Sequence, residues 1–246
     1  MDQQHKYLFD GNIMDEKLLN VLSDVPASTF DLIIFNPKVK DFPVKESIYS
    51  SWLFDLSQKM MRSLKSTGSM IVILKEGVEK GKRKTFALEY TMKMSDYWTE
   101  TYIWQKSNPH PTGNKKRLKD GFEYIFQFNR SNDYNFFPDN CLVKAKSQWT
   151  MGDSSSRLSR PSNVLSFPNG GDIPIGLCEF FINLMTEEGD LVFCPTLESG
   201  NEITACMNLN REYFGLCKDD GVLSTIEEKI LDWKERNLCV TETIFG

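Results

Sequence analysis

The chain has 246 residues, of which 40% are hydrophobic and 26% are charged. These values are ordinary for a globular protein, and the length suffices for one large α/β domain with a sizeable core. The formal net charge of −5 argues against a general nucleic-acid binder, so any such surface must be a local basic patch. No apolar run approaches the roughly 20 residues that cross a bilayer, and the start lacks a signal peptide's apolar stretch. We therefore expect a soluble, intracellular protein (cytoplasm or nucleus) without a membrane partner.

Cysteine and histidine usage gives no sign of a metal centre or a disulfide framework. The six cysteines are scattered, with no close pair that resembles a zinc knuckle, and several stand within apolar runs. The two histidines, His5 and His110, have no cysteine or carboxylate at metal-ligand spacing. The chain also lacks a Walker loop and a Gly-x-Ser-x-Gly nucleophile motif. We expect a reduced protein without a metal.

The first third of the chain predicts a strand–helix–strand unit. The apolar run 32–35 predicts a strand, and Ser47 is a candidate N-cap for the helix that follows it. The apolar residues of this helix fall at helical spacing, namely at Ile48, Trp52, Leu56, Met60 and Leu64. Residues 65–68 are expected to end the helix, and the apolar run 69–74 predicts the next strand. Such a unit indicates a parallel sheet with helices on both faces.

The rest of the chain continues this pattern, and we predict one domain spanning residues 1–246. The basic run 79–84 is expected to open a helix that ends near Met94, and the aromatic-rich runs 97–105 and 122–128 are expected to be strands. Ser224 and Glu227 form a capping box for a final helix with one apolar face, made by Val222, Ile226, Ile230 and Trp233. The remaining expected elements are a strand near 7–12, a helix near 15–22, a helix over 174–188, a strand at 190–194, a turn at 195–200, a helix at 203–209 and a strand at 213–217.

The segment Asp31-Leu-Ile-Ile-Phe-Asn36-Pro37-Lys38 places polar residues directly after a buried strand. In α/β sheets, ligands bind just beyond the carboxyl ends of the strands, so Asn36 is a candidate functional residue. The alternative interpretation is that Asn36 and Pro37 only terminate the strand, because both are common turn residues.

Residues 106–119 carry five lysines or arginines and no acidic residue, while Pro and Gly keep the segment irregular. A flexible basic loop of this kind is typical of a phosphate-contacting element, and the alternative is a solvated surface loop. Residues 131–171 show poor periodicity and contain a second, weakly basic stretch at 154–160, which we interpret as part of an insertion on the scaffold. The candidate nucleic-acid-binding residues are Lys106, Lys115, Lys116, Arg117, Lys119, Arg157 and Arg160.

The order of several motifs resembles that of DNA amino-methyltransferases acting on adenine N6 or cytosine N4. The segment from Asp31 to Val39 resembles the family's DLIxxDPPY motif, and residues 52–69 resemble its WL…LKPGGS helix and strand. Residues 104–108 resemble WxKxN, and residues 123–128 resemble the strand that follows the basic loop. Further matches are residues 174–190 with KPxxLxERLI…GD, residues 192–200 with VLDPFxGSG, and residues 211–215 with RxYxG.

The resemblance covers roughly residues 7–217 and has the β arrangement, in which the catalytic motif precedes the cofactor motif. It implies an α/β fold of the Rossmann-like, S-adenosylmethionine-dependent methyltransferase type, with a mostly parallel twisted sheet and helices on both faces. It further implies that 131–168 is the target-recognition segment. DNA is the implied partner molecule, and S-adenosylmethionine is the implied cofactor.

Methyl transfer to an exocyclic amine requires a base flipped out of its stack and acceptors that orient its amino group. Asn36 stands at the family's Asp/Asn/Ser position, so its side chain and the carbonyl of Pro37 are the implied catalytic acceptors. Lys38 replaces the family's second proline, and Val39 replaces its aromatic residue. Because valine cannot stack on a base, the loss is roughly 1–3 kcal/mol, unless Phe42 replaces the missing ring.

The matched cofactor turn departs further from the family pattern. Cys194 stands at the position of its acid, Thr196 at that of its Phe, and Glu198 at that of its first Gly, where a glycine allows close backbone approach. The acid expected for the ribose hydroxyls aligns with Cys217, with Asp219 as a candidate substitute. The lysine that precedes Pro174 in the family is Ile173. The implied cofactor-binding residues are Cys194, Pro195, Glu198, Ser199, Gly200 and Cys217.

These departures fall on both halves of one expected site, so binding of the cofactor is in doubt. We expect a degenerate, non-catalytic DNA-binding subunit that partners an active methyltransferase, in a homo- or heterodimer. One alternative is an active S-adenosylmethionine-dependent DNA methyltransferase with an unusual pocket. Another alternative is a DNA-binding or interaction module without a link to methylation.

Overall fold

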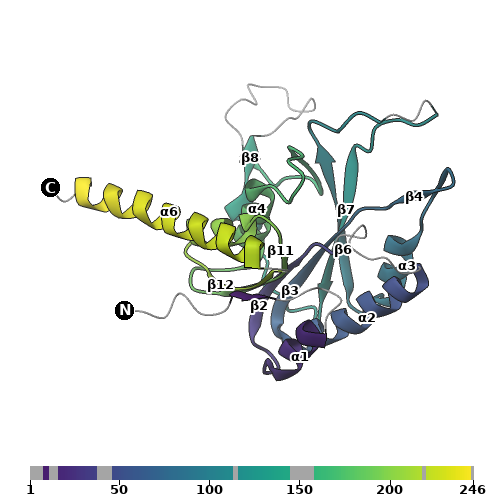
Figure 1. Ribbon diagram of the computed structural model, residues 1–246, viewed down its shortest axis with the longest axis horizontal. Coiled ribbons are helices and arrows are strands. Elements are labelled where there is room, and N and C mark those ends of the chain that lie inside the picture. The colour runs from purple at the N-terminus through teal and green to yellow at the C-terminus, as the bar shows by residue number, and fades with distance from the viewer. Residues whose placement is uncertain are drawn as a thin grey trace.

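A computed structural model of the chain describes residues 8–10, 16–37, 46–112, 116–144, 158–217 and 220–244. Its central feature is an eight-stranded sheet with the spatial order β1-β12-β11-β2-β3-β7-β6-β10 (Figure 1). The strands are β1 (Leu8–Asp10), β2 (Phe30–Phe35), β3 (Leu64–Leu74), β6 (Trp98–Lys106), β7 (Phe122–Asn129), β10 (Val164–Phe167), β11 (Leu191–Leu197) and β12 (Glu212–Cys217). All neighbouring pairs are parallel except the two made by β7, which runs antiparallel to β3 and β6. The expected mostly parallel sheet is therefore confirmed.

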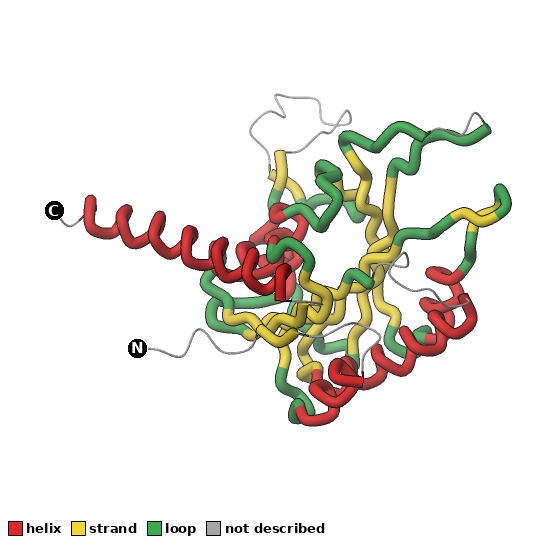
Figure 2. The backbone as a smooth tube through the Cα atoms, in the orientation of Figure 1, coloured by secondary structure: helices red, strands yellow, loops and turns green. Residues whose placement is uncertain are grey.

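Helices cover both faces of this sheet, as the sequence predicts (Figure 2). One face carries α1 (Glu16–Asp24), α2 (Glu46–Ser63) and α3 (Phe86–Lys93), and the other carries α4 (Ile175–Met185), α5 (Asn201–Asn208) and α6 (Asp220–Ile244). Residues of β2 alternate between the two cores: Ile33 packs in the first and Leu32 in the second. Both are fully buried, which explains why the strand reads as a continuous apolar run.

The basic run 79–84 forms a hairpin, so the predicted helix start is wrong. Its strands are β4 (Val78–Glu79) and β5 (Lys82–Arg83), which pair antiparallel. The two residues between them have positive φ angles, 50° at Lys80 and 79° at Gly81. A two-residue hairpin loop needs positive φ at both positions, and glycine adopts it readily. The helix begins only at Phe86.

Three further boundaries differ from expectation. The segment 65–68 belongs to β3, which begins at Leu64, instead of ending α2. β11 continues to Leu197 through an irregularity after Cys194, which shortens the expected turn at 195–200. The capping box at Ser224 is absent, because α6 begins at Asp220 and Ser224 Oγ donates to the Asp220 carbonyl, at 2.9 Å.

The segment 131–168 contributes to the main sheet through its last strand, since β10 pairs with β6. Before β10 it contains the short 3₁₀ helix Pro138–Cys141 and a two-stranded ribbon of β8 (Val143–Lys144) and β9 (Leu158–Ser159). Residues 145–157 lie outside the described residues. Target recognition by 131–168 stays a prediction. None of the helices that the structure describes is long and apolar enough to cross a membrane.

Candidate active site

The carboxyl ends of β2, β3 and β11 meet at one edge of the sheet, because these strands are parallel neighbours. Asn36 follows β2 at this edge, and Glu198 follows β11. A cavity of about 450 Å³ opens here. Its walls include Asn36, Pro37, Trp104, Lys106, Glu123 and Asp172.

The two halves of the site that the sequence predicts lie in contact. The backbone N–H of Asn36 donates to Thr196 Oγ1, at 3.1 Å, and so ties the loop after β2 to the end of β11. The Asn36 side chain is half-buried and lines the cavity, beside the buried Pro37. Lys38, Val39 and Phe42 lie outside the described residues, so the expected loss of a stacking ring stays a prediction.

Asp31, at the other end of the same strand, has a structural role. Its buried carboxylate accepts from Lys65 Nζ, at 2.8 and 2.7 Å, and from the backbone N–H of Leu191, at 3.0 Å. These bonds connect β2 to β3 and β11. They hold the three strands whose carboxyl ends carry the site.

A buried ion pair forms one wall of the cavity. Lys106 Nζ lies 2.6 Å from Glu123 Oε1, and the side chains are only 3% and 11% exposed. The ammonium also stands 5.3 Å from the centroid of the Trp104 ring, within the range of a cation–π interaction. Lys106, predicted to bind nucleic acid, therefore faces the cavity, and any ligand that it contacts must enter that space.

The cofactor turn is held by side chains from two other parts of the chain. The backbone N–H of Ser199 donates to Asp172 Oδ2, at 3.1 Å, and the Ser199 hydroxyl donates to the same oxygen. Asp172 lies in the loop between β10 and α4. On the other side, Lys229 Nζ of α6 donates to the Ser199 carbonyl, at 2.6 Å. The chain's own groups thus engage all three polar positions of Ser199.

Gly200, the next residue, lies directly under α6. Its φ is 73°, a left-handed conformation that favours glycine, and a Cβ here would stand 2.9 Å from Ile226 Cγ1. Ile226 is 1% exposed, so the contact is closed to solvent. Figure 1 shows α6 beginning beside the ends of β11 and β12 and then extending away from the sheet. The first turns of α6 therefore cover the turn that the sequence assigns to the cofactor.

The two cysteines that stand at the positions of the expected acids are both buried. Cys194 and Cys217 are 1% and 2% exposed. A hydrogen bond with Cys206, together with burial, raises the pKa of the Cys194 thiol well above its ordinary value. Cys194 is therefore neutral at physiological pH and supplies no negative charge. Glu198 is half-buried at the end of β11, whereas Asp219 lies outside the described residues.

Two basic segments stand together beside the cavity. The hairpin segment 75–84 contains five basic and two acidic residues, and the segment 106–121 contains five basic and one acidic residue. Arg83 Nη2 of the hairpin lies 2.8 Å from Asp120 Oδ1, and Arg117 Nη2 lies 3.7 Å from the same atom. Asp120 thus joins the two segments. Positive charge gathers here although the whole chain has a net charge of −5.

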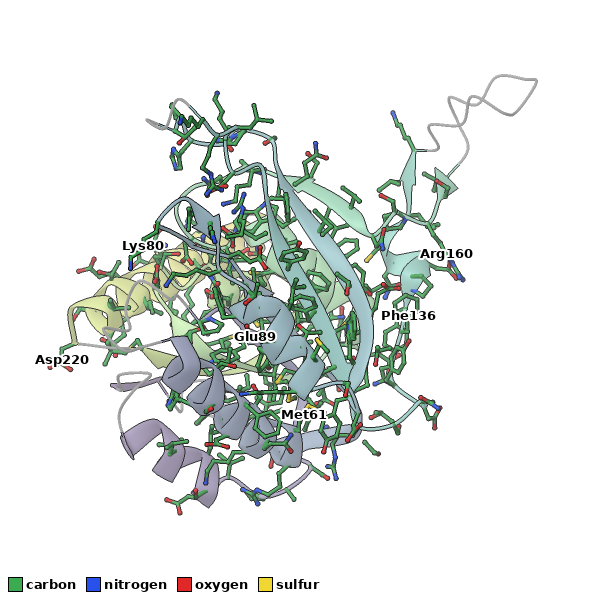
Figure 3. All side chains as sticks on the ribbon, turned by 90° about the vertical axis from the view of Figure 1, so that its right-hand side faces the viewer. Met61, Lys80, Glu89, Phe136, Arg160 and Asp220 are labelled. Carbon is green, nitrogen blue, oxygen red and sulfur yellow. The ribbon has the colours of Figure 1, made fainter. Side chains whose placement is uncertain are left out.

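The other predicted nucleic-acid-binding residues divide into three groups. Lys116 and Lys119 are exposed on the same segment as Arg117. Arg160 lies elsewhere: Figure 3 shows it with Phe136, on the opposite side of the view from Lys80 of the hairpin. Its nearest carboxylate is that of Asp139, at 3.8 Å. Lys115 and Arg157 lie outside the described residues.

Sequence reasoning missed Asp172, Lys229 and the basic hairpin. Asp172 directly precedes the Ile173-Pro174 pair that the resemblance matches, which was an available signal. The Lys80-Gly81 pair was a second signal, because glycine between charged residues favours a turn. Lys229 gives no sequence signal of its own. Among the described residues, no group of three or more His, Cys, Asp or Glu side chains could hold a metal ion.

Comparison with known proteins identifies the family. The family model of the N6_N4_Mtase DNA methylases matches residues 40–228. No curated protein matches the chain. Among solved structures, the chain is similar to the cytosine-N4-specific PvuII DNA methyltransferase, with 19% identity, a TM-score of 0.72, and 94% and 93% of the two chains covered. It is also similar to a proposed DNA modification methylase from Thermus thermophilus, with 17% identity, a TM-score of 0.70, and 92% and 94% covered.

A third similar structure is the M1.HpyAVI–SAM complex, with 17% identity, a TM-score of 0.58, and 91% and 97% of the two chains covered. These similarities confirm the expected methyltransferase fold. The family match spans well over half of the chain and agrees with the motif order read from the sequence. The chain belongs to the N6_N4_Mtase family of DNA methylases.

Proposed function

We propose that the chain is a DNA-binding member of its family that does not methylate DNA by itself and acts beside an active methyltransferase subunit. The observation that carries the proposal is the engagement of Ser199 by Asp172 and Lys229. The turn between a strand and the helix that follows it is where Rossmann-like proteins hold the anionic part of a ligand. In this chain an internal carboxylate occupies that position.

A ligand carboxylate would have to displace Asp172 to reach the Ser199 donors. Hydrogen bonds to a charged group contribute about 1.5–3 kcal/mol each, and the low end applies to the partly exposed Asp172. Loss of both bonds then costs about 3 kcal/mol, which corresponds to roughly a hundredfold in affinity. The Ile226 contact on Gly200 adds to this cost, because α6 would also have to move.

The remaining residues of the turn do not fit S-adenosylmethionine well. Its ammonium and ribose hydroxyl groups need hydrogen-bond acceptors, and carboxylates are the strongest of these. Cys194 and Cys217 replace the expected carboxylates, and a buried thiol is a weak acceptor. Weak binding of the cofactor, or none, is therefore the expected property of the isolated chain.

DNA binding is supported by the two basic segments joined at Asp120. The similar PvuII protein is named as a DNA methyltransferase, so a DNA surface is expected in the family. Phosphate contacts from lysine and arginine make such binding depend strongly on salt. The basic segments border the cavity beside Asn36, which supports a DNA surface next to that cavity.

A tritiated methyl-transfer assay tests the catalytic part of the proposal. The purified chain is incubated with labelled S-adenosylmethionine and unmethylated genomic DNA, alone and with any methyltransferase that co-purifies with it. We expect no transfer by the chain alone and transfer by the pair. Transfer by the isolated chain that disappears in Asn36→Ala would sink the proposal.

A second candidate function is catalysis in an unusual pocket, and one observation favours it. The cavity beside Asn36 measures about 450 Å³, within the roughly 300–1,000 Å³ of small-molecule sites. The same assay discriminates between the two functions, because only an active enzyme transfers label without a second chain.

The partner is tested by purification of the tagged full-length chain from its own cells. We expect a second, intact methyltransferase chain to co-purify at a stoichiometric ratio. Recovery of the chain alone, or only as a complex with itself, would contradict the heteromeric form of the proposal.

A further inference from the structure

A second cavity, of about 400 Å³, lies beside the first and shares Lys75, Glu76 and Glu123 with it. Its other walls come from the β4–β5 hairpin and from the segment that leads into β7. Figure 1 shows both of these extending from the same edge of the sheet. The two cavities therefore adjoin each other across β7, with Glu123 on the side of the first and Phe122 and Tyr124 on the side of the second.

Two arginines converge on one carboxylate in this second cavity. Arg83 and Arg117 both lie close to Asp120 Oδ1, at 2.8 and 3.7 Å. Each guanidinium carries five N–H donors, so together their donors exceed what one carboxylate can accept. Lys75 and Lys119 add two more positive charges to the walls, while Glu76 and Glu123 add two carboxylates, the second of which pairs with Lys106. The arrangement suits a phosphate group, which arginine binds through paired N–H bonds.

A fixed aromatic ring lines the same space. Phe122 is 44% exposed, although it stands at the start of β7. Its ring packs edge-on against Tyr124, with centroids 5.3 Å apart, and Tyr124 stacks on Phe126 at 5.6 Å. Alternate residues of a strand point to one face, so these three rings form a ladder along β7. The ladder orients the Phe122 ring while part of its surface stays accessible.

The combination of an accessible ring and paired guanidinium groups selects the ligand class. An inorganic anion would need the cations only, and an apolar ligand would need the ring only. A nucleotide has a planar base for the ring and a phosphate for the arginines. Proteins that hold single strands combine these two features, with bases stacked on aromatic side chains in a positively charged groove.

We propose that the second cavity holds one unstacked nucleotide of a DNA strand, with its base on Phe122 and its phosphate at Arg83 and Arg117. This site rests on the proposed DNA-binding function and adds to it a stacking position outside the Asn36 cavity. Phe122 thereby provides an aromatic face in a chain whose Val39 does not.

Fluorescence anisotropy with the full chain tests this site. The probes are a labelled oligothymidylate of about twelve nucleotides, a strand of equal length with abasic sites, and a duplex. Phe122→Ala should weaken binding of the oligothymidylate about tenfold, whereas Phe122→Tyr should retain it. Trp98→Ala is the control, because Trp98 is 47% exposed and stands at the start of β6, whereas Phe122 pairs with Gln105 near the other end of that strand.

The abasic strand separates stacking from phosphate binding. Phe122→Ala should leave its affinity unchanged, because no base is present. The double variant Arg83→Gln, Arg117→Gln should weaken binding of both strands. It should also make the slope of log K against log salt concentration shallower by about 0.7 for each lost phosphate contact. Circular dichroism and the unfolding midpoint of each variant verify that it is folded.

Two results would overturn the site. One is a loss in Phe122→Ala no larger than in Trp98→Ala, and the other is an equal loss on the abasic and thymidine strands. If duplex binding persists and still depends on Lys116 in either case, the DNA-binding function stands without the site. If the unaltered chain binds none of the probes, both the site and the DNA-binding function are wrong.

Discussion

The two halves of the site lie at the same edge of one sheet and differ in how they are filled. The half after β2 opens into a cavity of about 450 Å³ beside Asn36. The half after β11 is closed, because Ser199 bonds to Asp172 and Lys229 while Gly200 lies under Ile226. Strand order and register are common to both halves. Side chains from outside the strands therefore decide which half can receive a ligand.

This difference shows that one edge of a sheet can carry an open half and a closed half side by side. The Asn36–Thr196 hydrogen bond still joins the two halves, and Asp31 still connects the three central strands. The closing residues come from the β10–α4 loop and from α6, neither of which belongs to those strands. The turn is therefore closed by elements outside the three central strands.

The largest expected effect concerns the wall of the open half. Lys106→Met leaves the Glu123 carboxylate, 11% exposed, without its ion-pair partner, and should cost about 3 kcal/mol in the free energy of unfolding. Urea denaturation measures this. Arg236→Met is the control, because its pair with Asp232 is exposed and should contribute less than about 0.5 kcal/mol. Equal losses in the two variants would mean that the Lys106–Glu123 pair does not stabilise the open half.

The next effect concerns the packing of the closed half. Gly200→Ala should destabilise the chain by about 2 kcal/mol, from the left-handed backbone and from contact with Ile226. Gly81→Ala is matched in φ, at 79°, but has open space around it, so about 1 kcal/mol is expected. In an Ile226→Ala background, the two glycine substitutions should lower the free energy of unfolding by the same amount. A difference that persists there would show that α6 is not the cause.

A somewhat smaller effect is expected for the hydrogen bonds between Asp172 and Ser199 in the closed half. Asp172→Asn keeps the shape of the side chain but removes the charge that receives the Ser199 donors, at a cost of about 1.5 kcal/mol. Hydrogen exchange of the Ser199 amide should accelerate with it. An unchanged exchange rate would mean that Asp172 does not hold the turn.

The smallest effect is expected at the basic segment outside both halves. Replacing Lys115, Lys116 and Arg117 by Ala should weaken duplex binding about tenfold. The slope of log K against log salt concentration should become shallower by up to about 0.9 for each lost phosphate contact. Anisotropy titrations at several salt concentrations give both quantities. The exposed Lys93 and Arg236, which have no predicted DNA contact, are changed to Ala as the control. If affinity and slope both stay unchanged in the triple variant, the segment is a solvated loop.

The sequence predicted the open half well and the closed half poorly, for physical reasons. The strand before Asn36 and the helix after it follow from local periodicity, which the structure confirms in β2 and α2. The hairpin at Lys80 was missed because its charged residues also suit a helix, whereas the positive φ angles of Lys80 and Gly81 belong to a hairpin turn. Asp172 and Lys229 lie 27 and 30 residues from Ser199 in sequence, so only tertiary packing brings them to the turn.

Isothermal titration calorimetry of the purified chain with S-adenosylmethionine tests the closed turn most directly. With Asp172 and Lys229 engaged at Ser199, we expect no saturable heat and a dissociation constant weaker than about 1 mM. Saturable binding with a micromolar dissociation constant would contradict the closed turn and, with it, the proposal that the chain does not methylate DNA by itself.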